Sequence, residues 1–144
     1  MMSISWTTIG EAAPQGSKRH VGRGVMIESS KKLPVWREQL INDIIRSADG
    51  CVFDSGVQVT LIFKFPRLKA HFNSKGQLKP NAPFFKTTKP DIDKLCRAVL
   101  DAITLSGVIR DDALCFSIEA QKVYCQEGES PGVSGTIMEL DIEL

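Results

Sequence analysis

The strictest pattern in this sequence is the alternation of residues 57–65. Five apolar residues, each separated by one residue, point the same way: Val57, Val59, Leu61, Phe63 and Phe65. A period of two residues is the signature of a β-strand with one buried face. Pro66 ends the strand because proline cannot donate a hydrogen bond to a sheet. The chain must therefore build a sheet and cover one face of it.

Two amphipathic helices are expected to supply that cover. Pro34 suits the first turn of a helix, and apolar residues recur at helical spacing from Trp36 to Ala48. A second apolar stripe begins at Ile92 and follows the helical repeat through a segment covering residues 90–106. Gly107 is the residue type expected just past the end of this helix.

Shorter segments complete the expected fold. Residues 3–9 and a segment around Met26 are predicted to be strands. The next strand, after Asp112, has one apolar face formed by Leu114, Phe116, Ile118, Ala120 and Tyr124. Residues 128–135 are expected to form a turn. The last strand is expected to point four residues inward, namely Met138, Leu140, Ile142 and Leu144. The order β-β-α-β-α-β-β predicts an α+β fold with a mixed sheet and two main helices, in a single domain spanning residues 1–144.

The net charge of +1 hides two unequal halves. Residues 1–90 carry 14 basic and 6 acidic residues, whereas residues 91–144 carry 4 basic and 11 acidic residues. Such asymmetry points to a polyanionic partner more strongly than the total charge does. The loop at residues 66–90 contains six of the basic residues and no acidic one, and a loop of this length is usually functional or disordered.

Composition excludes several other classes. A hydrophobic content of 42% is too high for a disordered chain, and no apolar run is long enough to cross a membrane. The N-terminus lacks the pattern of a secretory signal, and no common NTPase, serine-hydrolase or zinc-protease motif occurs. The cysteines have no C-x-x-C spacing, which favours reduced thiols in a cytoplasmic protein: Cys51, Cys96, Cys115 and Cys125.

Carboxylates gather around the second helix. Asp91 and Asp93 stand at its start, where extended geometry allows the first residue to fold back beside the third. Asp112 follows the helix, and an adjacent antiparallel strand is expected to return it to this pair. Three convergent carboxylates suit Mg²⁺, which promotes phosphodiester hydrolysis, and Arg97 is placed to stabilise the transition state.

Each of these residues also has a plainer explanation. A lone Asp91 or Asp93 is compatible with helix capping, and Asp111-Asp112 is compatible with a turn. The spacing of Asp93, Arg97 and Asp101 also fits an ordinary surface ion pair. Residue type and spacing alone leave both explanations open.

The same stretch carries a resemblance to a known family. Its motif is Asp91-x-Asp93-x-Leu95-x-Arg97-Ala98-x-x-Asp101-Ala102, followed by Gly107-Val108-Ile109 and Asp111-Asp112. This motif resembles that of the RusA family of Holliday junction resolvases, close to D-x-D-N-x-x-K-A-x-x-D-A-L with a later D-D pair. Two positions differ, since Arg97 replaces the catalytic lysine of the family and Lys94 replaces its asparagine.

The resemblance implies a Mg²⁺-dependent endonuclease, with Mn²⁺ as a substitute, that resolves four-way DNA junctions by paired symmetric nicks in recombination and repair. It implies that Asp91, Asp93 and Asp112 hold the metal and that Arg97 takes the place of the catalytic lysine. It assigns a structural role to Asp101 and makes Asp111 a neighbour of the site. A homodimer in the cytoplasm of a bacterial or phage-infected cell is expected, because a four-way junction has approximate two-fold symmetry.

The basic residues then gain a role as phosphate contacts. The residues expected to contact DNA are Lys18, Arg19, Arg23, Lys69, Lys75, Lys86, Lys89 and Lys94. Phe72, Phe84 and Phe85 either stack on unpaired bases or, as the preferred explanation, pack their loop onto the domain. His71 is expected at the surface. Two alternatives remain: a nuclease for other branched DNA, and a non-catalytic DNA-binding module with a structural cation.

Overall fold

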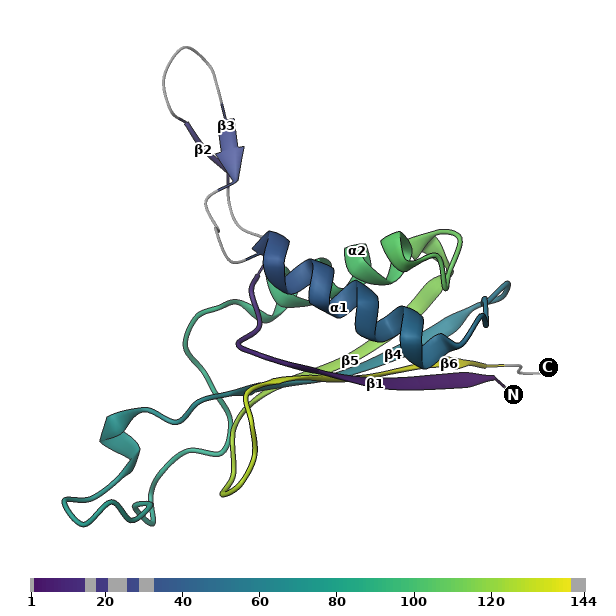
Figure 1. The fold of residues 1–144 in the computed structure, drawn as a ribbon. Helices are drawn as coiled ribbons and strands as arrows, with labels where there is room; N and C mark the ends of the chain where they lie inside the picture. The colour runs from purple at the N-terminus through teal and green to yellow at the C-terminus, as the bar shows by residue number, and fades with distance from the viewer. Residues whose placement is uncertain (1, 15–17, 21–25, 29–32, 141–144) are drawn as a thin grey trace.

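The computed structural model describes residues 2–14, 18–20, 26–28 and 33–140 (Figure 1). In chain order its elements are β1 (Ser3–Ile9), β2 (Lys18–His20), β3 (Met26–Glu28), α1 (Leu33–Ala48), β4 (Val57–Phe65), η1 (Lys69–His71), α2 (Ile92–Ser106), η2 (Asp112–Leu114), β5 (Cys115–Tyr124) and β6 (Gly132–Glu139). The predicted α+β fold is confirmed, and β2 is a strand that the sequence pattern did not predict. Within the described ranges, no helix is long and apolar enough to cross a membrane.

The main sheet has four strands in the order β1-β6-β4-β5. Strand β6 runs antiparallel to both β1 and β4, whereas β5 runs parallel to β4. Parallel neighbours need a long crossover connection. Here the crossover consists of residues 66–89, which we call the basic arm, and α2. In Figure 1 the basic arm extends away from the sheet, while β2 and β3 form a separate antiparallel pair.

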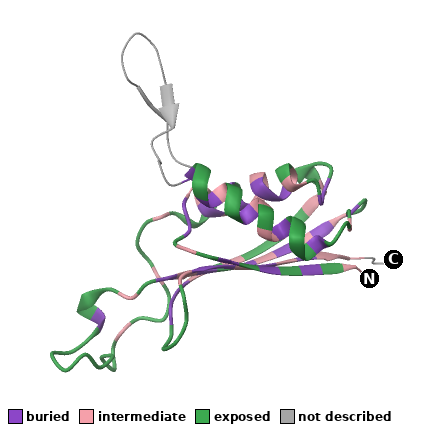
Figure 2. Cartoon of the chain, viewed as in Figure 1, coloured by how far each residue is buried: buried purple, intermediate pink, exposed green. Residues whose placement is uncertain are grey.

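Both helices lie on the same face of the main sheet (Figure 1). The alternation predicted for residues 57–65 is confirmed, because the five odd-numbered residues of β4 are buried beneath the helices. α1 contributes Trp36, Leu40 and Ile44 to this core, and α2 contributes Leu95, Val99 and Ile103. In Figure 2 buried residues appear on both helices and along the strands beneath them. The opposite face of the sheet carries no helix and is only partly buried.

The prediction of which residues of the last strand point into the core is wrong. Val133 and Ile137 of β6 are buried on the helix face, whereas Met138 and Leu140 are only half-buried. Ile142 and Leu144, also predicted to point inward, lie outside the described residues. The expected turn at residues 128–135 is too long, because β6 already begins at Gly132.

The glycines of β6 explain this error. A Cβ atom on Gly132 would lie 2.1 Å from the main-chain oxygen of Thr8, and one on Gly135 would lie 2.4 Å from the ring of Trp6. Both glycines therefore allow β1 to pack closely against β6, although in the sequence they are typical of a turn.

The predicted apolar face of β5 is also only partly correct. Phe116 and Ile118 remain 57% and 39% exposed, whereas Tyr124 is buried. β5 is an edge strand, and its register with β4 shifts between Val57 and Gln58. Because β5 has a neighbouring strand on one side only, Phe116 and Ile118 stay partly in solvent.

Gly135→Ala tests the close packing of β6. We expect the free energy of unfolding to fall by about 1–3 kcal/mol, because the added methyl group forces the Trp6 ring to move. Ser134→Ala, on the open face of the same strand, is the matched control and should change stability by less than about 0.5 kcal/mol. Urea unfolding of both variants measures this difference, and equal stabilities would contradict the packing role of Gly135.

Candidate functional site

The N-terminal end of α2 presents two exposed carboxylates. Asp91 is the N-cap residue, with φ −70° and ψ 137°, and its main-chain oxygen accepts a hydrogen bond from Leu95 N–H at 3.2 Å. Its side chain makes no capping hydrogen bond. Asp93 follows in the first turn of the helix. Capping therefore does not account for Asp91, and both carboxylates face solvent at the point where the basic arm ends.

Arg97 lies one turn further along α2 and is exposed. In the described part of the chain it forms no ion pair with Asp93 or Asp101, so the expected pairing of Arg97 with Asp101 is not found. Asp101 is half-buried. The guanidinium of Arg97 is therefore accessible to a phosphate group near the acidic end of the helix.

The two carboxylates of the D-D pair differ in their environment. Asp111 caps η2, and its Oδ1 accepts a hydrogen bond from Ala113 N–H at 2.9 Å. This bond lowers the pKa of Asp111. A hydrogen bond with Asp111 raises the pKa of Asp112, and repulsion from Asp111 and Asp101 acts in the same direction. Asp111 thus has a structural partner, whereas Asp112 is an exposed carboxylate crowded by negative charge.

The structure does not gather all three predicted metal ligands. No group of three or more acidic, cysteine or histidine side chains among the described residues is arranged to hold a metal ion. β5 pairs in parallel with β4, so the antiparallel return expected for Asp112 is wrong. α2 has 15 residues and is about 22 Å long, and Asp112 follows its far end. Asp101, from the third turn of α2, is the helix carboxylate that affects the pKa of Asp112.

The thiols of Cys96 and Cys115 each interact with one of the carboxylates Asp93 and Asp112. Burial raises the pKa of both Cys96 and Cys115, and the two side chains lie within electrostatic range of each other. The charge of Asp93 adds to the effect at Cys96, and the charge of Asp112 adds to it at Cys115. Asp93 and Asp112 therefore both border the contact between α2 and the start of β5. All four cysteines are free thiols, as expected from the sequence.

The donor set fits a hard divalent cation. Mg²⁺ is usually held by one or two carboxylates, keeps several waters, and takes further oxygen ligands from substrate phosphates. Asp91 and Asp93 provide two exposed carboxylates that the fold does not use for capping. A complete protein cage is not needed for such a site, so its incomplete ligand set agrees with this chemistry.

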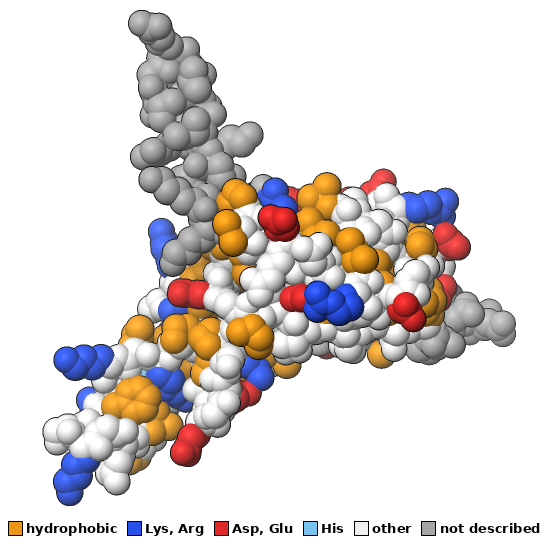
Figure 3. All heavy atoms as spheres, in the orientation of Figure 1, with side chains coloured by type: hydrophobic (Ala, Val, Ile, Leu, Met, Phe, Trp, Pro, Cys, Tyr) orange, Lys and Arg blue, Asp and Glu red, His pale blue; other side chains and the backbone are white. Residues whose placement is uncertain are grey.

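The cations of the basic arm fall into two groups. Four lysines are exposed: Lys69, Lys75, Lys79 and Lys89. Lys86 instead packs over the rings of Phe65 and Tyr124, 5.4 Å from each centroid, and its Nζ donates to Thr88 Oγ1 at 2.9 Å. Figure 3 shows basic and apolar side chains mixed along the basic arm. Lys69, Lys75 and Lys89, which were predicted to contact DNA, are thus exposed, whereas Lys86 stabilises the arm.

The other predicted DNA contacts are less defined. Lys18 and Arg19 belong to β2, where the backbone alone is described, and Arg23 lies outside the described residues. Lys94 is half-buried in the first turn of α2. The exposed basic surface that the structure describes is therefore the one formed by the basic arm.

The aromatic residues of the basic arm are not packed into the core. Phe84 and Phe85 are 49% and 53% exposed, and their rings meet edge to face with centroids 5.0 Å apart. Phe72 is 37% exposed. The preferred explanation, packing of the loop onto its own domain, therefore does not account for the exposed half of Phe84 and Phe85.

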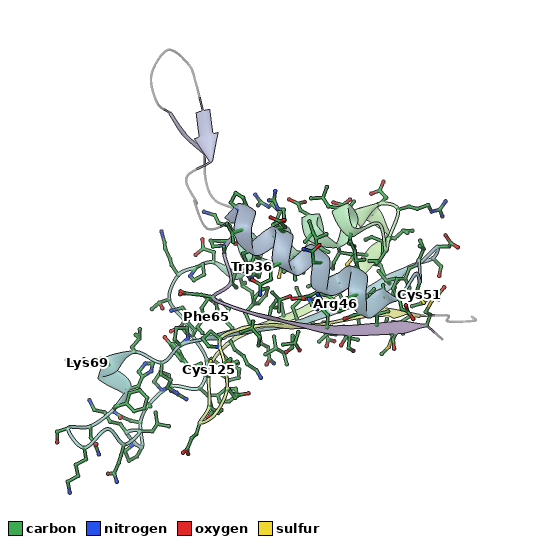
Figure 4. The ribbon with its side chains drawn as sticks, in the orientation of Figure 1. Trp36, Arg46, Cys51, Phe65, Lys69 and Cys125 are labelled. Atoms are coloured by element: carbon green, nitrogen blue, oxygen red, sulfur yellow. The ribbon has the colours of Figure 1, made fainter. Side chains whose placement is uncertain are left out.

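The base of the basic arm holds residues that the sequence did not single out. His71, expected at the surface, is buried and meets the Tyr124 ring edge-on at 4.6 Å. Arg67 donates from Nη1 to Pro83 O at 2.6 Å and from Nε to Cys125 O at 3.1 Å. Figure 4 shows Phe65 and Cys125 near this base and Lys69 further out. Lys122 of β5 also contacts this base, since its Nζ donates to Thr88 O at 2.7 Å. The sequence offered one signal for it, because Lys122 falls on the predicted apolar face of the strand after Asp112.

A hollow of about 890 Å³ lies between the basic arm and the turn that joins β5 to β6. Its lining includes Arg67, Phe72 and Leu78 from the arm and Glu127 and Glu129 from the turn. Its lining contains none of the carboxylates of α2, and the side chains of Asp91 and Asp93 are exposed to solvent. An open surface suits a large substrate such as a DNA strand.

An acidic pair at the end of a basic arm places carboxylates next to groups that can bind phosphates. A sequence profile of the family described as Endodeoxyribonuclease RusA matches residues 10–137. The match covers most of the chain, so the chain belongs to the RusA family of endodeoxyribonucleases, and the resemblance seen in the motif is confirmed. Membership supports nuclease activity for this protein. No match was found among curated proteins.

The pKa of His71 makes the stability of the basic arm depend on pH. Burial lowers this pKa, and the charges of Arg67, Lys86 and Lys79 lower it further, while Nδ1 accepts a hydrogen bond from Leu68 N–H at 3.2 Å. The unfolded chain therefore binds protons more strongly than the folded chain. In the unfolded chain the pKa of His71 is about 6.5. The stability that neutral His71 contributes is therefore present above this pH, and it is lost as the pH falls through the lower pKa of the folded chain.

We expect the melting temperature to fall between about pH 7.5 and pH 5, and to fall less in His71→Gln. Calorimetric scans of the wild type and of His71→Gln across this pH range measure the two melting temperatures. Both proteins have the same acidic groups, so the difference between the two pH dependences reports His71 alone. Identical pH dependence of the two melting temperatures would contradict the role of His71.

Proposed function

We propose that this protein is a Mg²⁺-dependent, structure-selective endonuclease that resolves four-way DNA junctions by paired symmetric nicks, in recombination and repair. One observation carries the proposal: the two exposed carboxylates at the start of α2, unused by capping, stand directly at the end of the basic arm. Phosphate binding and cation binding are thereby available at adjacent places. Family membership supplies the nuclease class.

Asp91, Asp93 and Asp112 are the residues proposed to hold the cation, with Mn²⁺ as a substitute for Mg²⁺. When bound, such a cation would supply Lewis-acid activation of a water and neutralise charge on the scissile phosphate. Asp112 is assigned by the family motif, and its crowding by Asp111 and Asp101 favours a nearby positive charge.

Arg97 is proposed to bind a non-bridging oxygen of the scissile phosphate. Its charge stabilises the negative charge that grows in the transition state, and its planar donors can contact two oxygens at once. A guanidinium stays protonated near neutral pH, so Arg97 does not donate a proton to the leaving group. This protein thereby differs from family members in which lysine occupies the position.

The exposed lysines of the basic arm, including Lys69, Lys75 and Lys89, are proposed to hold DNA backbones across the site. Contacts of this kind give affinity without sequence preference. Phe84 and Phe85 offer two half-exposed rings on the same arm. Stacking of such rings on unpaired bases would favour branched DNA over a continuous duplex.

The substrate also implies an assembly. A four-way junction has approximate two-fold symmetry and needs nicks on two opposing strands, so we propose a homodimer of single-domain chains spanning residues 1–144, one site in each. Free cysteines agree with the reducing cytoplasm of a bacterial or phage-infected cell. Two other functions stay in view: a nuclease for forks or flaps, and a non-catalytic DNA-binding module with a structural cation.

Asp91→Asn provides the direct test. The purified protein is incubated with a synthetic four-way junction and Mg²⁺, and the nick positions are mapped on each strand. We expect the wild type to nick two opposing strands symmetrically. The variant should lose more than about 100-fold in rate, because it removes a cation ligand rather than a supporting residue, while keeping its affinity for the junction.

The matched control is Asp43→Asn on α1, where the carboxylate pairs with Arg46, and this variant should cut at the wild-type rate. A junction that is bound and never cut by the wild type would overturn the enzymatic function. Cutting of linear duplex at the rate of the junction would instead indicate a general nuclease, and preference for forks or flaps would indicate the other branched substrates.

A further inference from the structure

Lys122 is a cation placed on the helix-facing side of the main sheet. It pairs with Phe63 in the parallel register of β4 and β5, between Ala120 and Tyr124 on the same face. Phe63 and Tyr124 are buried, and Lys122 itself is half-buried. A lysine is rarely placed on an inward face unless its charge has partners.

Two main-chain carbonyls at the end of the basic arm are those partners. Lys122 Nζ donates to Thr88 O at 2.7 Å and to Pro90 O at 2.8 Å. Its own main-chain oxygen accepts a hydrogen bond from Lys86 N–H at 2.9 Å. One residue of β5 therefore fixes three points on the segment that leads directly into Asp91.

The charge of Lys122 has no carboxylate partner at ion-pair distance in the described residues. Asp91 is nevertheless close enough to interact favourably with the ammonium group, against the opposing effect of Lys86. An ammonium group has three N–H donors, and the two carbonyls take two of them. Lys122 thus supports both the backbone before Asp91 and the negative charge of its side chain.

We propose that Lys122 is a positioning residue for the nuclease site, an inference that rests on the proposed function. It fixes the bend from Thr88 to Pro90 and thereby sets where Asp91 starts α2. Without it, the two carbonyls lose their shared donor, and the segment between the basic arm and the acidic pair gains freedom. The exposed lysines of the arm, which would contact DNA, are not part of this contact.

The test compares Lys122→Met, which removes the donors and keeps the length, with Lys122→Arg, which keeps the charge and can donate to both carbonyls. Single-turnover cleavage of a four-way junction should fall roughly 10- to 100-fold in Lys122→Met, with junction affinity in metal-free buffer unchanged. The Mn²⁺ concentration that gives half-maximal cleavage should rise. Lys122→Arg should recover most of the loss.

Amide hydrogen exchange supplies a readout that does not depend on activity. Exchange in residues 86–95 should speed up in Lys122→Met, while exchange in β4 stays at the wild-type rate. Lys64→Met is the matched control, because Lys64 is a part-buried lysine of β4 on the face opposite the helices, where it pairs with Glu129 of the β5–β6 turn. Lys64→Met should lower the stability of the protein, but the Mn²⁺ concentration that gives half-maximal cleavage should stay at the wild-type value.

The outcomes separate this inference from the function on which it rests. If Asp91→Asn abolishes cleavage and Lys122→Met cuts and exchanges like the wild type, the positioning role is wrong and the function stands. The role is also wrong if Lys122→Met only lowers the melting temperature, or if the Arg and Met variants lose equally. If Asp91→Asn cuts normally, the proposed nuclease site itself fails.

Discussion

The parallel pairing of β4 with β5 is the constraint on which the rest of the structure depends. Parallel neighbours cannot be joined by a tight turn, so the chain must leave the sheet after Phe65 and return at Cys115 through a long crossover. The basic arm therefore leaves the sheet at the carboxyl end of β4, and the residues just before α2 contact Lys122 near the carboxyl end of β5. Topology brings the basic and acidic segments together.

The cations near the start of α2 have two different roles. Arg67 and Lys86 of the arm, together with Lys122 of β5, direct their charged groups onto carbonyls or the Tyr124 ring, and so hold the base of the arm. The outer lysines remain exposed. The net charge of +1 consequently describes neither surface, since basic groups facing solvent stand beside carboxylates that also face solvent. Such a boundary can bind a polyanion and a cation at once.

Much of the fold could be predicted because the patterns are local. The period of residues 57–65 gave the buried face of β4, and Gly107 ends α2 with the expected left-handed geometry, φ 81°. Long-range packing was not visible: Gly135 resembles a turn residue until Trp6 lies against it. The acidic pair was identified from its motif. The role of Lys122 depends on two carbonyls more than thirty residues away, which no local pattern encodes.

The proposed function requires Asp93 and Asp112 to serve one cation, although Asp93 lies at the start of α2 and Asp112 follows its far end. Electron paramagnetic resonance of bound Mn²⁺, in the wild type and in Asp93→Asn and Asp112→Asn, tests this claim most directly. A shared site predicts that each variant weakens the same Mn²⁺ binding by at least about tenfold. Wild-type Mn²⁺ binding by Asp112→Asn would contradict it.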